Sequence, residues 1–233
     1  MNASQPTDFN VSLGQLLDHS RTEPYCHWGI VCYDGKGCRS FLDPNTEGLS
    51  PLTRLLAHYP IRSQMAIARL IRCQHRYSLA AAEPFTRECR GQYWSFCYEG
   101  TLEGADALPL GRLLPVGTSV AERLFCHLLY QLEQRPAPAD DPMGLLQLLD
   151  ELLPALAGCS HLLLCNHELL LVYSRHPIYW QPSHTAHPDA RHILVATQLL
   201  PTEHAWQTHE AGRPLLLRRG KLVTLADGVT AHT

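Results

Sequence analysis

The order of the predicted elements constrains the fold of this chain more than any other feature of its sequence. Strand-like segments come first, two leucine-rich helices follow, and the last third returns to strands. This order suggests two sheets with helices packed between or beside them, which is an α+β layered domain. No internal repeat or linker interrupts it, so we expect the 233 residues to form one domain over 1–233.

Two central helices are predicted from apolar periodicity. Over 119–134 the apolar residues recur every four positions, at Val120, Leu124, Leu128 and Leu132. Ser119 and Glu122 fit a capping box at the start of this helix. A second helix is predicted over 143–158, interrupted near Pro154.

Strands are predicted on both sides of these helices. The early strands are 28–33, its returning partner 38–41, then 65–71 and 93–98. A short helix over 50–59 is predicted between the strands 38–41 and 65–71. The late segments are a hairpin over 161–173, strands at 177–182 and 191–200, and a hairpin over 214–225 that turns at Arg219-Gly220.

Composition excludes several classes of function. The apolar share of 45% supports a sizeable core, and the net charge of −3 gives no reason to expect nucleic acid or an anionic membrane as a partner. The first residues lack a basic start and an apolar signal core, and no apolar run reaches the length of a membrane span. We therefore expect a cytoplasmic protein that binds neither nucleic acid nor membrane.

Cysteine and histidine usage gives no metal or cofactor signal. The nine cysteines are odd in number and contain no Cys-x-x-Cys, so reduced and mostly buried thiols are expected. His184 and His187 have metal-ligand spacing, but a solvated loop is the simpler interpretation. Cys26 and His27 are adjacent, which argues against a nucleophile pair because neighbours in a strand point to opposite faces. No metal and no cofactor is predicted.

Two arginines and one loop are candidates for ligand contacts. Arg72 and Arg87 each suit either a carboxylate clamp or a surface charge, and the sequence does not decide between these. The stretch SFCYEGTLEG, 95–104, indicates a strand that enters a tight loop. Such loops often present N–H groups to a developing negative charge, yet Glu99 places a carboxylate there.

Several stretches in order resemble bacterial class II glutamine amidotransferases of the small, stand-alone kind. The resemblance covers the chain from about Asn2 to Val223, and the stretches that carry it are HWGIVCYDGKGCRSF, SPLTRLLAHYPIRS, EPFTRE, YWSFCYEGTLEG, the helix after PVG, and VATQLLPTEHAWQ. The resemblance implies a four-layer αββα N-terminal-nucleophile hydrolase sandwich, with two antiparallel sheets between helical layers.

The chemistry of this family needs few groups. An N-terminal Cys attacks the glutamine carboxamide, with its own α-amino group as base. An Asn-Gly pair supplies donors for the oxyanion. An Arg holds the substrate carboxylate, and a later Asp holds the substrate ammonium.

The sequence departs from this pattern at most of these positions. Asn2 rather than Cys follows Met1, and the strand that bears the nucleophile is expected to be absent. The family's His-Asn-Gly corresponds to Tyr98-Glu99-Gly100, so only the glycine is retained. Val120 stands at the position of the Asp, and Cys26-His27 replaces an Asp-Gly.

The remnant substrate pocket is therefore predicted to comprise Arg72, Tyr98, Glu99, Gly100 and Val120, with no catalytic residue. The first hypothesis is an inactive amidotransferase-like domain that binds a small amide or amino-acid-like ligand or a protein partner. The alternative is an active amidotransferase or amidohydrolase whose N-terminal Cys comes from an upstream start or from processing before Cys26. A third hypothesis is a subunit that lends structure to an active paralogue.

Overall fold

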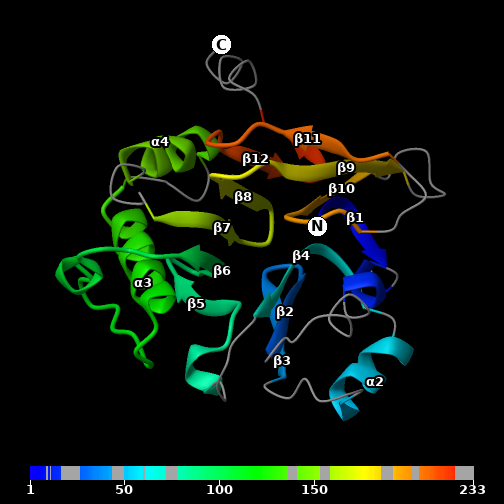
Figure 1. Ribbon diagram of the computed structural model, residues 1–233, viewed down its shortest axis with the longest axis horizontal. Helices are drawn as coiled ribbons and strands as arrows, with labels where there is room; N and C mark the ends of the chain where they lie inside the picture. The colour runs from blue at the N-terminus through cyan, green and yellow to red at the C-terminus, as the bar shows by residue number, and fades with distance from the viewer. Residues whose placement is uncertain are drawn as a thin grey trace.

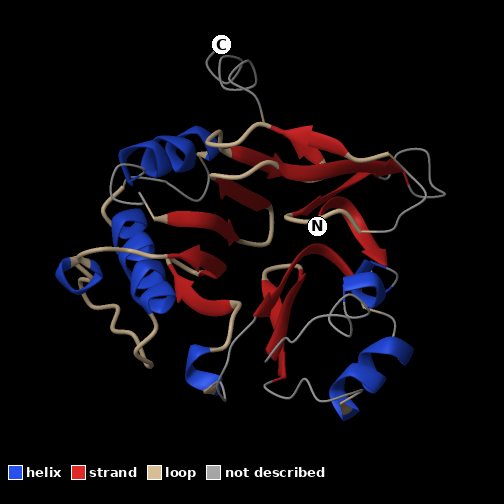
Figure 2. Cartoon of the chain, viewed as in Figure 1, coloured by secondary structure: helices blue, strands red, loops and turns tan. Residues whose placement is uncertain are grey.

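Two antiparallel sheets stack face to face between helices in the computed structural model (Figure 1; Figure 2). The structure describes residues 1–8, 10, 12–16, 27–43, 50–59, 61–71, 78–135, 141–152, 158–184, 191–200 and 205–223. The four-layer αββα sandwich implied by the resemblance is confirmed. Helices lie outside both sheets, so the alternative in which helices pack between the sheets is wrong.

Sheet A is the larger of the two and, over these residues, has the strand order β11-β9-β10-β1-β4-β2-β3. Its strands are β1 (Asn2–Asp8), β2 (His27–Asp34), β3 (Gly37–Asp43), β4 (Arg62–Ile71), β9 (Ile178–His184), β10 (Arg191–Ala196) and β11 (Gln207–His209). The first strand thus lies in the middle of the sheet, between β4 and β10.

Sheet B has the order β13-β12-β8-β7-β6-β5. Its strands are β5 (Phe85–Cys89), β6 (Gln92–Gly100), β7 (Cys159–Cys165), β8 (Leu169–Ser174), β12 (Leu215–Arg218) and β13 (Lys221–Leu222). The hairpin predicted over 161–173 is the β7–β8 pair, in which Leu163 lies opposite Val172.

The facing sides of the sheets form a compact apolar core. Val31, Met65 and Ile67 of sheet A pack with Leu170 and Val172 of sheet B. Strands that are apolar on both sides are expected when a sheet is covered on both faces. This double coverage explains why β2 and β8 appear in the sequence as nearly continuous apolar runs.

The outer face of sheet B is covered by the two central helices, α3 (Val120–Glu133) and α4 (Pro142–Leu152). Phe125 of α3 stacks on Phe96 of β6 with ring centroids 5.2 Å apart. Ser119 is the N-cap but makes no side-chain cap hydrogen bond, so the capping box is wrong. Glu122 instead accepts hydrogen bonds from the backbone N–H groups of Val116 and Gly117.

The outer face of sheet A is covered more lightly. Helix α2 (Pro51–His58) and the helical residues 12–16 contribute Leu56 and Leu13 to a small cluster around Trp28 and Ile30. In Figure 1 α2 lies on the side of the molecule opposite α3 and α4. Within the described ranges there are also two 3₁₀ turns, η1 (Leu79–Ala81) and η2 (Ala105–Ala107).

The predicted strands and helices are found in the structure with small shifts at their ends. Three strands of the structure were not predicted from the sequence. These are β1, β5 and β11, and each alternates poorly or is very short. The β1 strand carries Gln5 and Pro6 at exposed positions, so its sequence lacks the apolar period of a strand.

The described cysteines are free thiols, as expected, and six of the seven are buried. Within the described ranges no group of three His, Cys, Asp or Glu side chains is placed to hold a metal ion. None of the described helices is long and apolar enough to cross a membrane.

Candidate functional site

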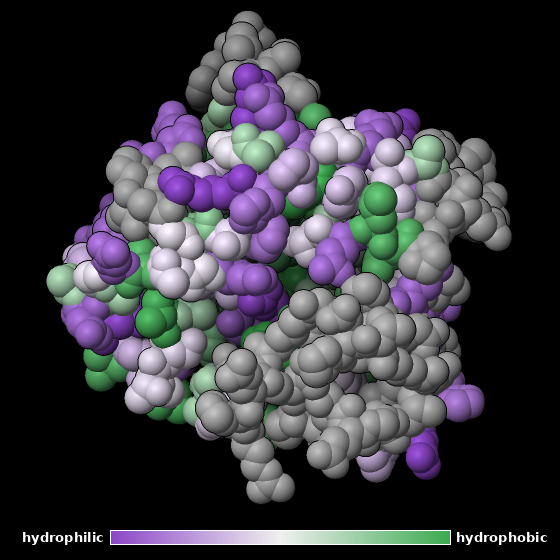
Figure 3. Space-filling model, in the orientation of Figure 1, coloured by the Kyte–Doolittle hydropathy of each residue, from purple (hydrophilic) through white to green (hydrophobic). Residues whose placement is uncertain are grey.

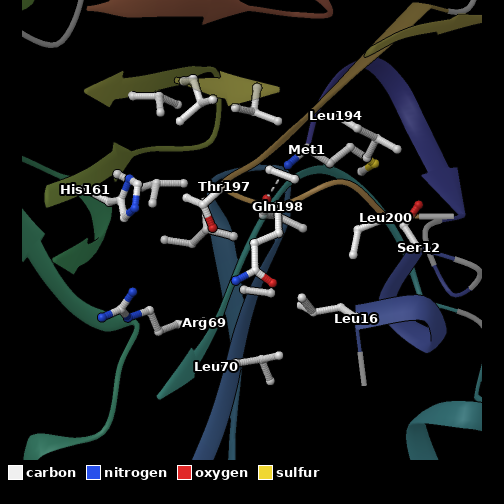
Figure 4. Close-up of a pocket in the computed structure, with 18 of the residues that line it drawn as sticks. Met1, Ser12, Leu16, Arg69, Leu70, His161, Leu194, Thr197, Gln198 and Leu200 are labelled. Carbon is white, nitrogen blue, oxygen red and sulfur yellow. Dashed lines mark hydrogen bonds between the residues drawn. The ribbon is translucent and has the colours of Figure 1, made fainter. Parts of the chain in front are cut away.

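A cavity of about 500 Å³ opens between β4 and β10, at the point where β1 begins. Figure 4 shows the side chains that line it, with Met1 and Leu194 on one side and Arg69 and His161 on the other. Hydrophobic side chains are recessed near the middle of the face shown in Figure 3, with hydrophilic residues around them. A volume of this size and a mostly apolar wall are typical of small-molecule sites.

Met1 lies at one wall of this cavity. Its α-amino nitrogen donates a hydrogen bond to the carbonyl oxygen of Ala66 at 2.7 Å (Figure 4). Burial lowers the pKa of this amine to about 6. A neutral amine is therefore favoured at pH 7, since removal of an ammonium from water is costly.

The polar end of the cavity is formed by Arg69 of β4 and Glu99 of β6. Nη1 of Arg69 donates to Oε2 of Glu99 at 2.7 Å, and Nη2 donates to the carbonyl oxygen of Tyr98 at 3.3 Å. The guanidinium side chain is only 16% exposed, whereas that of Glu99 is 52% exposed. This ion pair joins the two sheets at the cavity.

Glu83 lies behind Arg69 and is almost fully buried. One of its carboxylate oxygens lies 3.6 Å from Nε of Arg69 and accepts a hydrogen bond from the backbone N–H of Tyr98 at 2.8 Å. Burial raises the pKa of Glu83 to about 7, although the charge of Arg69 acts against this rise. Arg69 is thus shared by two carboxylates.

Gly29 of β2 brings the Glu83 segment close to sheet A. A Cβ atom at Gly29 would lie 2.1 Å from the carbonyl oxygen of Glu83, so a side chain there would push the segment away. His27, two residues earlier on β2, places Nε2 3.4 Å from the same oxygen. The position of Glu83 next to Arg69 therefore depends on a glycine at position 29.

His161 of β7 lies directly across from Glu99 in the β6–β7 ladder and lines the cavity. Its Nδ1 lies 2.9 Å from Oγ of Ser174. Burial lowers the pKa of this imidazole. His161 is accordingly expected to be neutral at pH 7, so it adds no charge at this end of the cavity.

Gly100 ends β6 with φ of 147°. A Cβ atom there would lie 2.3 Å from the carbonyl oxygen of Gly158, and the ladder with β7 shifts register at this point. Only glycine fits such a conformation without strain. The strand that was expected to end in a tight loop after Tyr98 therefore continues through Glu99 and stops at Gly100.

The structure brings together some of the predicted pocket residues. Glu99 lines the cavity and Gly100 follows it, but the ring of Tyr98 packs against Phe96 in the α3 core. Val120 is 41% exposed at the start of α3 and does not line this cavity. Arg72 lies outside the described residues, as do Cys26 and His187.

The remaining candidates also have definite positions. Arg87 donates to Glu122 at 2.6 Å, so it holds a carboxylate of its own chain. His184 ends β9, where its backbone pairs with Arg191. Arg87 does not line the cavity.

Three residues of the site were missed by sequence analysis. Arg69, Glu83 and His161 come from three separate parts of the chain and meet only in the folded protein. Arg69 gave a usable signal, because a charged residue inside the apolar run of β4 indicates a buried partner. The residues around Glu83 and His161 gave no such signal.

Comparisons with known proteins agree with this architecture. The family described as glutamine amidotransferases class-II matches residues 1–181. "Putative glutamine amidotransferase YafJ" of Escherichia coli is 34% identical over 188 residues, which cover 77% of this chain and 73% of that protein. A "Putative glutamine amidotransferase" of Haemophilus influenzae is 27% identical over 179 residues, which cover 74% of this chain and 60% of that protein.

Solved structures share the fold at lower identity. The "predicted glutamine amidotransferase from Pseudomonas aeruginosa PA01" superposes with a TM-score of 0.70 at 22% identity, over 85% of this chain and 87% of that one. The glutamine phosphoribosylpyrophosphate amidotransferase of Bacillus subtilis superposes with a TM-score of 0.60 at 15% identity, over 95% of this chain and 47% of that one.

The stacked sheets with outer helices and a cavity between β4 and β10 define an αββα sandwich of the N-terminal-nucleophile hydrolase type. Within that class, the chain belongs to the class II glutamine amidotransferases.

Proposed function

We propose that this chain is a class II glutamine amidotransferase-like domain that binds an amide or amino-acid-like ligand and does not hydrolyse glutamine. One observation carries this proposal: the carboxylate of Glu99 lies beside the cavity and is held there by Arg69 at 2.7 Å. In the resembling family an Asn amide at the corresponding position donates to the oxyanion. A carboxylate has no N–H to donate.

The expected loss of rate is large. Removal of one oxyanion donor costs about 10²–10³ in rate. An ionised carboxylate in its place adds repulsion, because like charge faces the developing negative charge. Arg69 compensates for part of the charge of Glu99 in the resting protein, and its Nη1 and Nη2 groups donate to Glu99 and to the carbonyl oxygen of Tyr98.

The ligand class follows from the charges around the cavity. Arg69 already faces Glu83 and Glu99, so it has little capacity left for a ligand carboxylate. Glu99 is half exposed and accepts hydrogen bonds. These groups favour a ligand that presents an ammonium or an amide N–H to Glu99 and an apolar body to the rest of the cavity.

The direct test is release of ammonia and glutamate from glutamine by the purified protein. We expect no release above that of a buffer control. Turnover that is lost in the Cys26→Ala variant would overturn the proposal, because it would identify a working nucleophile. Binding is measured separately, by calorimetry with glutamine and with an aliphatic primary amide.

A second candidate is an active glutamine amidotransferase or amidohydrolase whose nucleophile precedes Met1 or arises by processing. The cavity next to Glu99, with the Met1 amine in its wall, favours this candidate. The mass of the protein from its native cells tests it, when combined with the turnover assay. The active-enzyme candidate is supported only if the protein has an N-terminal Cys, Ser or Thr and also releases ammonia from glutamine.

The remaining expectations stay predictions. These are a single domain over 1–233, a cytoplasmic location, and a protein partner or an active paralogue. Co-purification with a second amidotransferase that bears an N-terminal Cys would favour the paralogue.

A further inference from the structure

A row of three polar side chains crosses sheet B next to the cavity. Glu99 of β6 lies opposite His161 of β7, and His161 lies opposite Ser174 of β8. Residues that lie opposite each other in a ladder place their side chains on the same face of the sheet. Glu99 and His161 line the cavity, and Figure 4 shows His161 on the same side of it as Arg69. We call Glu99, His161 and Ser174 the polar row.

Hydrogen bonds determine which nitrogen of His161 carries the proton. The hydroxyl of Ser174 donates to the carbonyl oxygen of His176 at 2.7 Å and accepts from the backbone N–H of His176 at 3.0 Å. A hydroxyl has one proton to donate. The remaining contact, 2.9 Å between Nδ1 of His161 and Oγ of Ser174, is therefore donated by Nδ1. In a neutral imidazole that is protonated on Nδ1, Nε2 is an acceptor.

The acceptor nitrogen of His161 is directed away from Ser174. The two ring nitrogens lie on different edges of the imidazole, so Nε2 faces away from β8 when Nδ1 faces it. Burial lowers the pKa of His161, whereas the negative charge of Glu99 acts against this change. The carboxylate of Glu99 is thus close enough to influence the imidazole, and the two side chains can act on the same ligand.

The polar row contains the residue types of a serine hydrolase triad without its chemistry. A serine nucleophile must give its proton to the imidazole that serves as base. Ser174 is 2% exposed and gives its proton to a backbone carbonyl instead. We therefore interpret the row as a binding surface, in which Ser174 orients His161.

Glu99 and His161 present two acceptors side by side. Opposed residues of a ladder have Cβ atoms about 5 Å apart, so one ligand nitrogen can contact both side chains. A carboxylate accepts at several lone pairs, so the bond from Arg69 does not exclude a ligand N–H. An ammonium has three N–H donors and no acceptor, whereas a carboxamide has an oxygen that needs a donor. The pair of acceptors favours an ammonium.

We propose that Glu99 and His161 bind the primary ammonium group of a ligand whose aliphatic part lies against Leu163 and Val172. Glu99 supplies the opposite charge, and Nε2 of His161 accepts a second N–H and orients the group. Leu163 follows His161 on the same face of β7, and Val172 lies opposite Leu163 on β8. Both apolar side chains line the cavity. The inference rests on the proposed function, because it names the ligand class of the same cavity.

The first experiment compares three probes by calorimetry in phosphate buffer near pH 7: n-pentylamine, n-pentanamide and n-pentanoate. The amine is expected to bind at least about tenfold more tightly than the other two, because it alone pairs with a carboxylate and brings no acceptor. Tighter binding of the amide would overturn the inference and leave the proposed function standing. Binding of none of the probes would also overturn it. Ammonia release from glutamine would refute the proposed function without entering this comparison.

Substitutions at His161 separate the roles of its two nitrogens. His161→Asn keeps an N–H near the position of Nδ1 for Ser174 but removes the acceptor at Nε2. His161→Gln places an amide oxygen near the position of Nε2. The Asn variant is expected to bind n-pentylamine about tenfold more weakly, and the Gln variant is expected to retain most of the affinity. Unchanged affinity in the Asn variant, or an equal loss in both variants with a lowered Tm, would overturn a role of His161 in binding.

Substitution of the carboxylate tests the charge. Glu99→Gln is expected to weaken n-pentylamine binding by about tenfold or more and to change n-pentanamide binding little, because only the amine carries a charge. Glu103→Gln is the matched control, since Glu103 is an exposed carboxylate in the loop after β6. The control is expected to bind n-pentylamine like the parent protein. Equal affinities in Glu99→Gln and Glu103→Gln would overturn the proposal.

Discussion

The two sides of this molecule differ in how their interiors are filled. The region between sheet B and the α3–α4 layer is a dense apolar core, in which Phe125, Leu129 and Leu145 are fully buried. The region between β4 and β10 holds a cavity of about 500 Å³ with Arg69 and Glu99 at one end. The first region stabilises the fold, and the second carries the groups that a ligand can contact. The cavity walls Ile67, Leu170 and Val172 also belong to the core between the sheets, so only the core under α3 and α4 is largely separate from the candidate site.

Truncation of a core leucine gives the largest expected contrast between the two regions. Leu129→Ala is expected to cost about 3–5 kcal/mol, because it opens a void in a packed core. Leu194→Ala, at the cavity wall, is expected to cost about 1 kcal/mol or less, since its neighbours already face open space. Urea unfolding of both variants measures the difference. Equal costs would show that the cavity is closed in solution.

Removal of the guanidinium at the cavity gives the next effect. Arg69→Leu leaves Glu83 and Glu99 without their cation and is expected to cost about 3 kcal/mol near pH 8. Arg112→Leu is the matched control, because Arg112 is 72% exposed in its pair with Glu133. That exposed pair is screened by solvent and is expected to contribute far less to stability. Similar costs for the two variants would argue against a buried ion cluster at the cavity.

The pH dependence of stability tests the carboxylate of Glu83. Its pKa is raised to about 7 in the folded protein, mainly by burial, from 4.5. The folded state therefore holds the proton more tightly, so this group's contribution is fully present below pH 4.5 and is lost as pH rises through 7. The loss is on the order of 3 kcal/mol.

The Glu83→Gln variant is expected to remove that pH dependence while it keeps the shape of the side chain. Chemical unfolding at a series of pH values between 4 and 8 compares it with the parent protein. An unchanged slope in the variant would assign the dependence to another group. The Met1 amine cannot account for such a loss, because its lowered pKa acts in the opposite direction, with stability rising from about pH 6 to 8.

The smallest effect is expected at Val120, which was predicted to lie in the pocket. Val120→Asp places a carboxylate in the first turn of α3, where it is expected to stabilise the helix by about 0.5 kcal/mol. Ligand binding is expected to stay unchanged, since this residue does not line the cavity. Thermal unfolding and calorimetry check both statements. A higher affinity of the variant for an amino acid would show that Val120 belongs to the binding site after all.

Much of the fold was predictable because local patterns and tertiary packing agree. The spacing of apolar residues in α3 matches the face that it buries on sheet B, and the turn at Arg219-Gly220 joins β12 to β13 through two positive φ values. The strand β1 was missed because its pairing partners, β4 and β10, hold a polar segment in the middle of a sheet.

The candidate site was predictable only in part. Glu99 and Gly100 were found because the resemblance marked their loop, whereas Glu83 was not. The role of Glu122 as a cap was predicted from spacing, but the carboxylate binds Arg87 and two backbone N–H groups. Spacing along a chain does not reveal which distant donors compete for the same oxygen.

The sequence alone determined the layered α+β class, the two central helices and the family, because periodicity and ordered motifs are local properties of the chain. The tertiary structure decided that Arg69 is shared by Glu83 and Glu99, and that a cavity of about 500 Å³ adjoins them. These contacts join residues from separate strands and a loop, and burial sets their charges, so no local pattern encodes them.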